Sequence, residues 1–130
     1  MLNARSIAEI SKEAAGMNFF KVRDLPKKKI KVGIEVRSVY LKNVMFTYFE
    51  FERGQEIPSH SHPHEQITFI LEGEMQFKLG GEIKTIKAGE GVAVPSGIEH
   101  KAHAVTAVKV IDAWNPIRTD YIVSYLDSIM

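Results

Sequence analysis

Residues 54–66 read GQEIPSHSHPHEQ and contain three of the five histidines in this 130-residue chain. Alternate side chains of a β-strand point to the same face, so His60 and His62 lie on one side of their strand. Both can reach one metal ion at about 2.1 Å from each imidazole nitrogen. Gln66 has the same parity, and we expect it to bind the same ion.

A second stretch, residues 89–100 with the sequence GEGVAVPSGIEH, supplies His100 from a neighbouring strand. The agreement of spacing, strand parity and turn glycines favours a metal site over unrelated core or surface histidines. His64 also has the right parity, but Pro63 interrupts the ladder, which places His64 at the mouth of the pocket. His103 could reach the same rim. For His64 and His103, an ordinary surface position is an equally good interpretation.

The sequence around these two stretches alternates between apolar and polar residues with a period of two, which is typical of β-strands. Gly80-Gly81 separates two such segments and predicts a tight hairpin, because glycine tolerates the positive φ of the turn. Many short strands with no helix between them indicate an all-β barrel or sandwich. The predicted strands are Val44–Glu52, Gln66–Leu71, Glu74–Leu79, Ile83–Lys87, Gly91–Val94 and Val105–Asn115.

Both ends of the chain have helical patterns instead. Ser6 and Glu9 form a capping box, and the apolar spacing around them predicts a short helix within an N-terminal extension, residues 1–18. The barrel would then span residues 19–130 and end in a short helix over Tyr121–Ile129.

Composition excludes several classes of protein. The net charge of +1, from 17 Lys and Arg against 16 Asp and Glu, is small for a nucleic-acid-binding protein. The basic run at residues 27–31, KKKIK, therefore favours a solvated strand edge or linker over contact with nucleic acid or a membrane. The chain has no cysteine, which excludes disulfides and thiolate zinc sites. No apolar run approaches the roughly 20 residues of a membrane span, and we expect a cytoplasmic protein.

The two histidine stretches together resemble the two motifs of the cupin superfamily. Gln66 stands in the place of the usual Glu of the first motif, and Ala104 in the place of the usual Asn of the second. The resemblance implies a double-stranded β-helix, a jelly-roll-like barrel that holds one divalent metal ion. It also implies a homodimer, with apolar regions around Phe19-Phe20 and Val36–Leu41 as candidates for the interface. The matching positions are Gly54, His60, His62, Gly73, Gly89, Pro95, Gly97 and His100.

The four expected metal ligands, His60, His62, Gln66 and His100, are all uncharged. They leave the +2 charge of the ion uncompensated, so the ion should attract an anionic substrate and act as a strong Lewis acid. Imidazole suits Ni, Zn, Fe, Cu and Co, and related barrels also use Mn, so the identity of the metal stays open.

A further pair of candidates lies at the last predicted strand. Asp112 is an acidic residue within an apolar run, which is unusual unless the carboxylate is paired or takes part in chemistry. Arg118 follows the strand, where its guanidinium can clamp a carboxylate. The residues alone leave two interpretations open: a structural ion pair between Asp112 and Arg118, or a general acid or base beside an anion clamp.

With Trp114 included, this region resembles the small pectin-degradation cupins, which linearise 4,5-unsaturated uronates. The similarity runs from about Phe20 to Tyr121 and places the family's active-site Asp, aromatic and Arg at Asp112, Trp114 and Arg118. The family's aromatic is usually Phe. The resemblance implies an enzyme that opens the uronate ring by tautomerisation. A metal-dependent dioxygenase and a barrel that binds a sugar without changing it are the alternatives.

Overall fold

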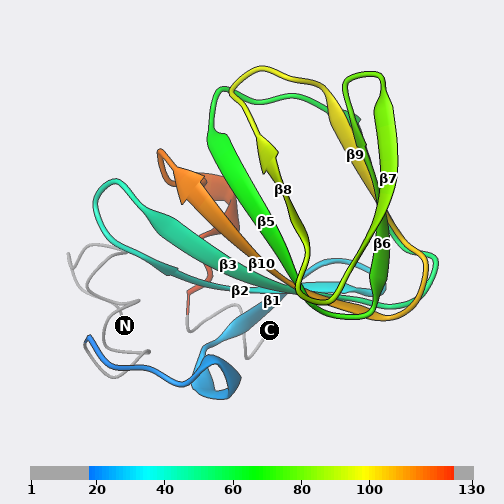
Figure 1. Ribbon diagram of the computed structural model, residues 1–130. Coiled ribbons are helices and arrows are strands. Elements are labelled where there is room, and N and C mark those ends of the chain that lie inside the picture. Colours follow the sequence, from blue (N-terminus) through cyan, green and yellow to red (C-terminus); the bar gives the residue numbers. More distant parts are fainter. Residues whose placement is uncertain (1–17, 125–130) are drawn as a thin grey trace.

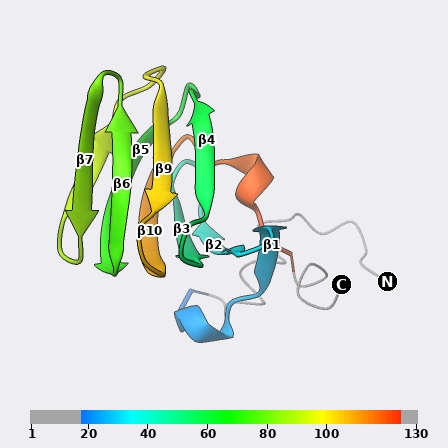
Figure 2. The same cartoon turned by 90° about the vertical axis from the view of Figure 1, so that its right-hand side faces the viewer.

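The computed structural model describes residues 18–124 and folds them into two antiparallel β-sheets that diverge from a common lower edge (Figure 1). The six-stranded sheet has the order β1 (Lys27–Lys31), β2 (Ile34–Tyr40), β3 (Met45–Phe51), β10 (Val108–Asn115), β5 (Glu65–Glu72) and β8 (Gly91–Val94). The four-stranded sheet has the order β4 (Glu56–His60), β9 (His100–Ala104), β6 (Glu74–Leu79) and β7 (Glu82–Lys87). Figure 2 shows this smaller sheet face on.

This architecture confirms the all-β fold predicted from the sequence. Strands β6 and β8 have the predicted bounds, β7 differs from prediction by one residue at its start, and β3 and β5 differ by one residue at each end. Strand β10 begins at Val108 and not at Val105, because residues 105–107 form the connection from β9. A Cβ atom at position 73 would lie 2.1 Å from the carbonyl oxygen of Ala107, so only Gly73 fits against this connection.

The inward faces of the two sheets share one hydrophobic core. Every second residue of β2 and of β3 is buried, as expected for strands with one face in the core. Full burial of each large apolar side chain contributes about 1.5–3 kcal/mol. The central members of the core are Ile34, Val36, Phe49, Ile70, Met75, Phe77, Val108 and Val110.

The proposed interface region is partly buried and partly exposed: alternate residues of Val36–Leu41 point inward, whereas Leu41 is 58% exposed, and Phe19 and Phe20 are exposed as well. Val36 is fully buried and Tyr40 is only 6% exposed. Exposed apolar side chains lie on the outer face of the six-stranded sheet, where Ala113 pairs with both Phe46 and Ile67. The homodimer stays a prediction, and a monomer mass from light scattering would count against it.

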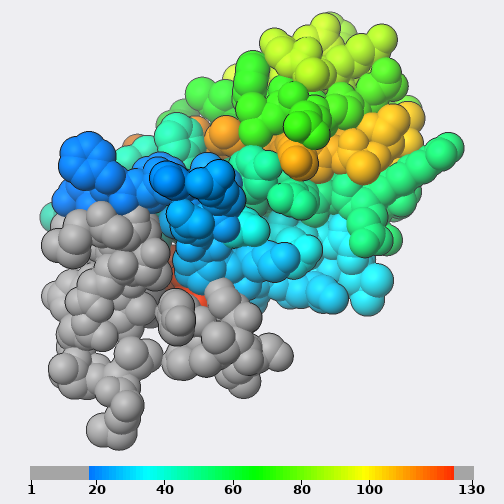
Figure 3. Space-filling model, turned by 90° about the horizontal axis from the view of Figure 1, so that it is seen from below, coloured from blue at the N-terminus to red at the C-terminus, as the bar shows by residue number. Residues whose placement is uncertain are grey.

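The basic run predicted to be a solvated edge forms β1, an edge strand that pairs only with β2 in the described part of the chain. Figure 3 shows this side of the molecule from below, with β1 in blue and β2 in cyan. A short 3₁₀ turn, η1 (Val22–Asp24), precedes β1. Nη1 of Arg37 on β2 binds the carbonyl oxygens of Arg23 and Leu25 at 3.0 and 2.6 Å, which fixes this turn against the sheet.

The two predicted terminal helices lie largely outside the described residues. This applies to the N-terminal helix and to the C-terminal helix beyond Ser124. Before that point the chain forms a second 3₁₀ turn, η2 (Thr119–Tyr121), and the buried Val123 donates its backbone N–H to the Ser38 hydroxyl at 3.2 Å. None of the helices in the described range is long and apolar enough to cross a membrane.

Candidate metal centre

Three histidines and a glutamine meet where β4, β9 and β5 approach one another. His60 ends β4 and His100 begins β9, and the two residues are register partners. His62 lies in the connection from β4 to β5, and Gln66 is the second residue of β5. The candidate ligand atoms of the three histidines all lie within 4.8 Å of one another.

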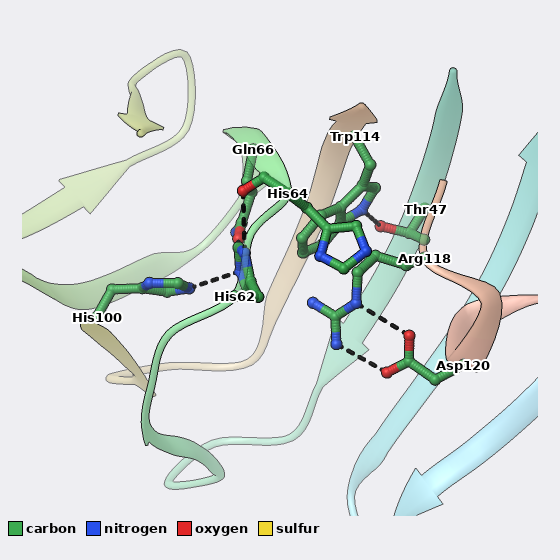
Figure 4. Close-up of polar contacts among 8 residues, drawn as sticks. All are labelled: Thr47, His62, His64, Gln66, His100, Trp114, Arg118 and Asp120. Atoms are coloured by element: carbon green, nitrogen blue, oxygen red, sulfur yellow. Dashed lines mark hydrogen bonds and ion pairs between the residues drawn. The ribbon is translucent and has the colours of Figure 1, made fainter. Parts of the chain in front are cut away.

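His62 is the central member of this cluster. Its Nε2 atom lies 3.1 Å from Nε2 of His100 and 3.0 Å from Oε1 of Gln66, as Figure 4 shows. Ligands that bind one ion at about 2.1 Å, at tetrahedral or octahedral angles, are about 3.0–3.4 Å apart. These two contacts therefore fit one metal ion. The ligand atom of His60 lies farther from the other two, so its imidazole would have to move slightly toward them to bind the same ion.

A backbone carbonyl two residues away orients each imidazole. The Nδ1-to-oxygen distances are 2.7 Å for His60 and Pro58, 3.0 Å for His62 and His64, and 2.8 Å for His100 and Ile98. A carbonyl oxygen only accepts hydrogen bonds, so each Nδ1 must carry the proton. Each neutral imidazole then keeps its Nε2 lone pair, which is the form that binds metals.

The donors of this cluster are suited to a cation. Two Nε2 lone pairs 3.1 Å apart repel each other unless a metal ion or a proton lies between them. Burial lowers the pKa of His62 and of His100, so both imidazoles are uncharged at neutral pH. The ring of Phe77 stacks against His100 with an interplanar angle of 10°, which further restricts that imidazole. The three histidines can thus hold a divalent metal with Gln66 as a fourth ligand.

Asp112, on β10, is buried beside this cluster and is held by two threonines. Its Oδ1 atom lies 2.5 Å from the Thr68 hydroxyl, and its Oδ2 atom lies 3.3 Å from the Thr47 hydroxyl. Burial raises the pKa of Asp112 to about 6, although the hydrogen bonds from both threonines oppose the shift. A carboxyl group with such a pKa can both accept and donate a proton near neutral pH.

Arg118 is paired with Asp120, so the interpretation of an Asp112–Arg118 ion pair is wrong. Its Nε and Nη2 atoms bind the two oxygens of Asp120 at 2.9 and 2.7 Å. Burial works against the charge of Arg118, but the Asp120 carboxylate outweighs it, and the pKa of Arg118 is raised. The guanidinium carbon also lies 4.8 Å from the ring centre of Trp114 and 4.3 Å from that of Tyr121.

Two polar atoms near this guanidinium are buried without a hydrogen-bond partner among the described residues. They are Nη1 of Arg118 and Nδ1 of His64. Buried polar groups are normally satisfied, so these unpartnered ones call for an explanation. Both atoms can donate to an anion, and Figure 4 shows His64 between the metal cluster and Arg118.

Trp114 is only 4% exposed and is held on several sides. Its Nε1 atom donates to the Thr47 hydroxyl at 2.8 Å, and its ring meets His62 edge to face at 5.3 Å. Arg118 lies over the indole as well, so Trp114 is held in place and offers little surface to a sugar ring.

The structure places His103 away from the pocket. It lies on β9 with its ring bonded to Glu56 at 3.0 Å, on the outer face of the four-stranded sheet. The sequence reasoning overlooked Thr68 and Thr47. Thr68 has the strand parity of Gln66 and could have been found on that ground. Thr47 is 65 positions from Asp112, and only the fold brings them together.

A small cavity lies beside the metal cluster and Asp112, and neither Arg118 nor His64 is among its lining residues. Its volume is about 40 Å³, and its walls include His60, Gln66, His100, Asp112 and Trp114. A buried water needs about 10–15 Å³ on this measure, so the cavity can admit a metal ion and part of a ligand. A whole monosaccharide would have to extend beyond it toward the mouth.

Comparisons with known proteins agree with this geometry. A family model described as a cupin domain matches residues 47–114, just over half of the chain. A search of curated proteins gave no significant match. An RmlC-like cupin from Shewanella frigidimarina is 27% identical, with a TM-score of 0.77 over 81% of this chain and 96% of its own. KdgF from Halomonas sp. is also 27% identical, with a TM-score of 0.76 over 79% of this chain and 96% of its own. The chain belongs to the cupin family.

Proposed function

We propose that this protein is a metal-dependent enzyme that opens the ring of a 4,5-unsaturated uronate. The observation that carries the proposal is the buried, unpartnered Nη1 of Arg118 beside an uncharged cluster of metal-binding side chains. Both features favour a negatively charged ligand. The structural similarity to KdgF agrees with the resemblance of the sequence to the pectin-degradation cupins.

In this proposal His60, His62, Gln66 and His100 hold one divalent metal ion. When bound, the ion supplies Lewis acidity that stabilises negative charge on a substrate oxygen. All four ligands are neutral, so the charge of the ion is not reduced before the substrate arrives. Imidazole-rich sites suit Zn, Ni, Co and Fe, and the metal determination described below identifies the ion.

Arg118 and His64 would bind the carboxylate of the uronate. Asp120 occupies one edge of the guanidinium through Nε and Nη2, which leaves Nη1 to face the ligand. A charge-assisted hydrogen bond from Nη1, with a second from Nδ1 of His64, would orient the substrate at the mouth of the cavity.

Asp112 would move the proton. Opening the ring breaks the bond between the anomeric carbon, C1, and the ring oxygen, while the C1 hydroxyl loses its proton and becomes an aldehyde. The ring oxygen keeps the electron pair as an enolate, and protonation at C4 then gives the 5-keto acid, so no co-reactant is needed. Asp112 lines the cavity and can accept the first proton and return it at C4.

The test is a metal determination on tag-free protein followed by an ultraviolet assay of the conjugated double bond of unsaturated galacturonate. Loss of the double bond with wild-type protein is expected, with a decrease of about 100-fold or more for Asp112→Asn. The substitution keeps the shape of the side chain, but the amide cannot carry the proton. Full turnover by the variant would refute the role of Asp112, and bound metal without turnover would refute the uronate substrate.

A non-catalytic role, in which the barrel binds a sugar or other small ligand without changing it, is the second candidate. A ligand recovered chemically intact after prolonged incubation would support this role. The dioxygenase alternative has less support, because the candidate ligand set lacks the carboxylate of common non-haem iron oxygenases. Iron-dependent oxygen consumption would revive it.

A further inference from the structure

The side-chain amide of Gln66 has two ends, and only one of them can bind a metal. Oε1 has lone pairs, whereas the Nε2 group is a double donor. Exchanging the two ends by rotation barely changes the shape of the side chain. A glutamate in the same place would have no such problem, because its two oxygens are equivalent. A metal centre that uses Gln66 therefore needs a group that selects the orientation of the amide.

We propose that Thr68 is the positioning residue that keeps Oε1 of Gln66 turned toward the histidines. This inference rests on the metal centre of the proposed function. Thr68 lies two residues after Gln66 on β5, so both side chains point to the same side. Nε2 of Gln66 donates to the Thr68 hydroxyl at 2.8 Å and has a longer contact of 3.5 Å with Oδ1 of Asp112, while Oε1 lies 3.0 Å from Nε2 of His62. Thr68 is thus the nearer of the two acceptors.

Counting protons shows why Thr68 must accept from the amide. Its hydroxyl has one proton, and the oxygen lies 2.5 Å from Oδ1 of Asp112. A carboxylate oxygen accepts, so Thr68 donates its proton there. What remains toward Gln66 is a lone pair, which binds the Nε2 group and would face Oε1 unfavourably if the amide turned over.

Trp114 fixes the direction of the hydrogen bonds on the other side of Asp112. An indole N–H can only donate, so the Thr47 hydroxyl accepts from it at 2.8 Å. The proton of Thr47 is then directed to Oδ2 of Asp112 at 3.3 Å. Both oxygens of Asp112 therefore accept hydrogen bonds. On one side the donors run from Gln66 through Thr68 to Asp112, and on the other from Trp114 through Thr47 to Asp112. Thr47 and Thr68 are at most 2% exposed, so water does not readily replace these bonds.

The experiment measures Co²⁺ binding to the full chain by titration, with the visible absorption of the bound ion as a second readout. Thr68→Val removes the hydroxyl and nearly keeps the shape, and Thr68→Ser restores the hydroxyl. We expect Thr68→Val to weaken Co²⁺ binding about 10- to 100-fold, as other outer-sphere changes do, and to alter the absorption bands. Thr68→Ser should bind and absorb like the wild type.

Gln66→Ala provides the matched background. If Thr68 acts through Gln66, then adding Thr68→Val to Gln66→Ala should weaken Co²⁺ binding no further. Equal losses with and without Gln66 would overturn the inference, as would wild-type binding by Thr68→Val. If the wild-type protein binds no Co²⁺, Zn²⁺ or Ni²⁺, the metal centre itself fails. Thermal unfolding of each metal-free variant identifies any that do not fold. If Thr68→Val does not fold, the test uses Thr68→Ser alone. Loss of Co²⁺ binding by a folded Thr68→Ser overturns the inference.

Discussion

The histidines and the glutamine of the metal cluster are oriented in two different ways. Each histidine takes its orientation from a backbone carbonyl two residues away. Gln66 depends on Thr68 and on Asp112, both through the Thr68 hydroxyl and through a longer direct contact of 3.5 Å from Nε2 to Oδ1 of Asp112. Asp112 is 44 positions from Thr68 in the sequence. The imidazoles are therefore set as soon as their local backbone is formed. The amide is set only when β5 and β10 have paired correctly.

The largest loss of metal binding is expected at the histidines, which are oriented by their local backbone. His62→Ala removes the central ligand and should weaken divalent metal binding roughly 100-fold or more, given about 10–16 kcal/mol for a complete protein zinc site of four ligands. Isothermal titration with Zn²⁺ measures the loss. Because the orienting contacts of His60 and His100 are their own, metal-free His62→Ala should remain folded. Wild-type affinity in this variant would contradict the assignment of the ligands.

A smaller effect is expected at Arg118, which shares features of both modes. Asp120, which orients Arg118, is close to it in the sequence. Arg118 is proposed to bind the substrate and not the metal. Arg118→Ala should lower kcat/KM for the uronate about 30- to 1,000-fold, from about 2–4 kcal/mol for a buried charged contact. Metal affinity should change little. Steady-state kinetics beside the Zn²⁺ titration separate the two.

Arg118→Lys is the matched control for this change. It keeps the positive charge but loses the planar fork that binds Asp120 and a carboxylate together. Activity close to the wild type in Arg118→Lys would show that charge alone suffices. It would argue against a directional role for Nη1.

The smallest effect is expected at His103, the histidine that faces outward. His103→Ala removes a half-exposed contact with Glu56, and such surface pairs contribute about 0–1 kcal/mol. Zn²⁺ affinity should equal that of the wild type. A clear loss would mean that the outer face of the four-stranded sheet affects the cluster, and the distinction between the two faces would fail.

The same contrast explains how far the sequence alone could go. The set of His60, His62, Gln66 and His100 follows from the spacing of the two motifs. The single strand expected to carry the first three is wrong, because β4 ends at His60, His62 lies in the connection, and Gln66 lies on β5 of the other sheet. The burial of Val36 also follows from the alternation of its strand. The same apolar pattern suggested an interface, because a period of two does not show whether a face packs in the core or against another molecule. The Asp120 partner of Arg118 is only two residues away, but the ion pair considered from the sequence was with Asp112 instead, and the fold corrects this.

Contacts between distant residues were beyond sequence reasoning. Thr47 and Trp114 are 67 positions apart, and no local pattern marks Thr47 as the acceptor of the indole N–H. Likewise, no local pattern indicates that the carbonyl oxygen of Ala107 lies against Gly73, or that β10 begins at Val108. These contacts depend on which strands pair, and the spacing of residues along the chain does not predict the order of strands in a sheet.

The lysine-rich strand β1 limits how copies of this protein can associate. Among the described residues it is the outer strand of the six-stranded sheet, and such edges readily add strands from other molecules. Lys27, Lys29 and Lys31 are exposed along it, and Lys27 pairs with Glu35 at 3.4 Å. A second copy adding its own β1 would still bring the lysines of the two strands close together. Strand addition at this edge is thereby disfavoured, and aggregation through it is suppressed at high protein concentration. A dimer, if formed, would have to use another surface.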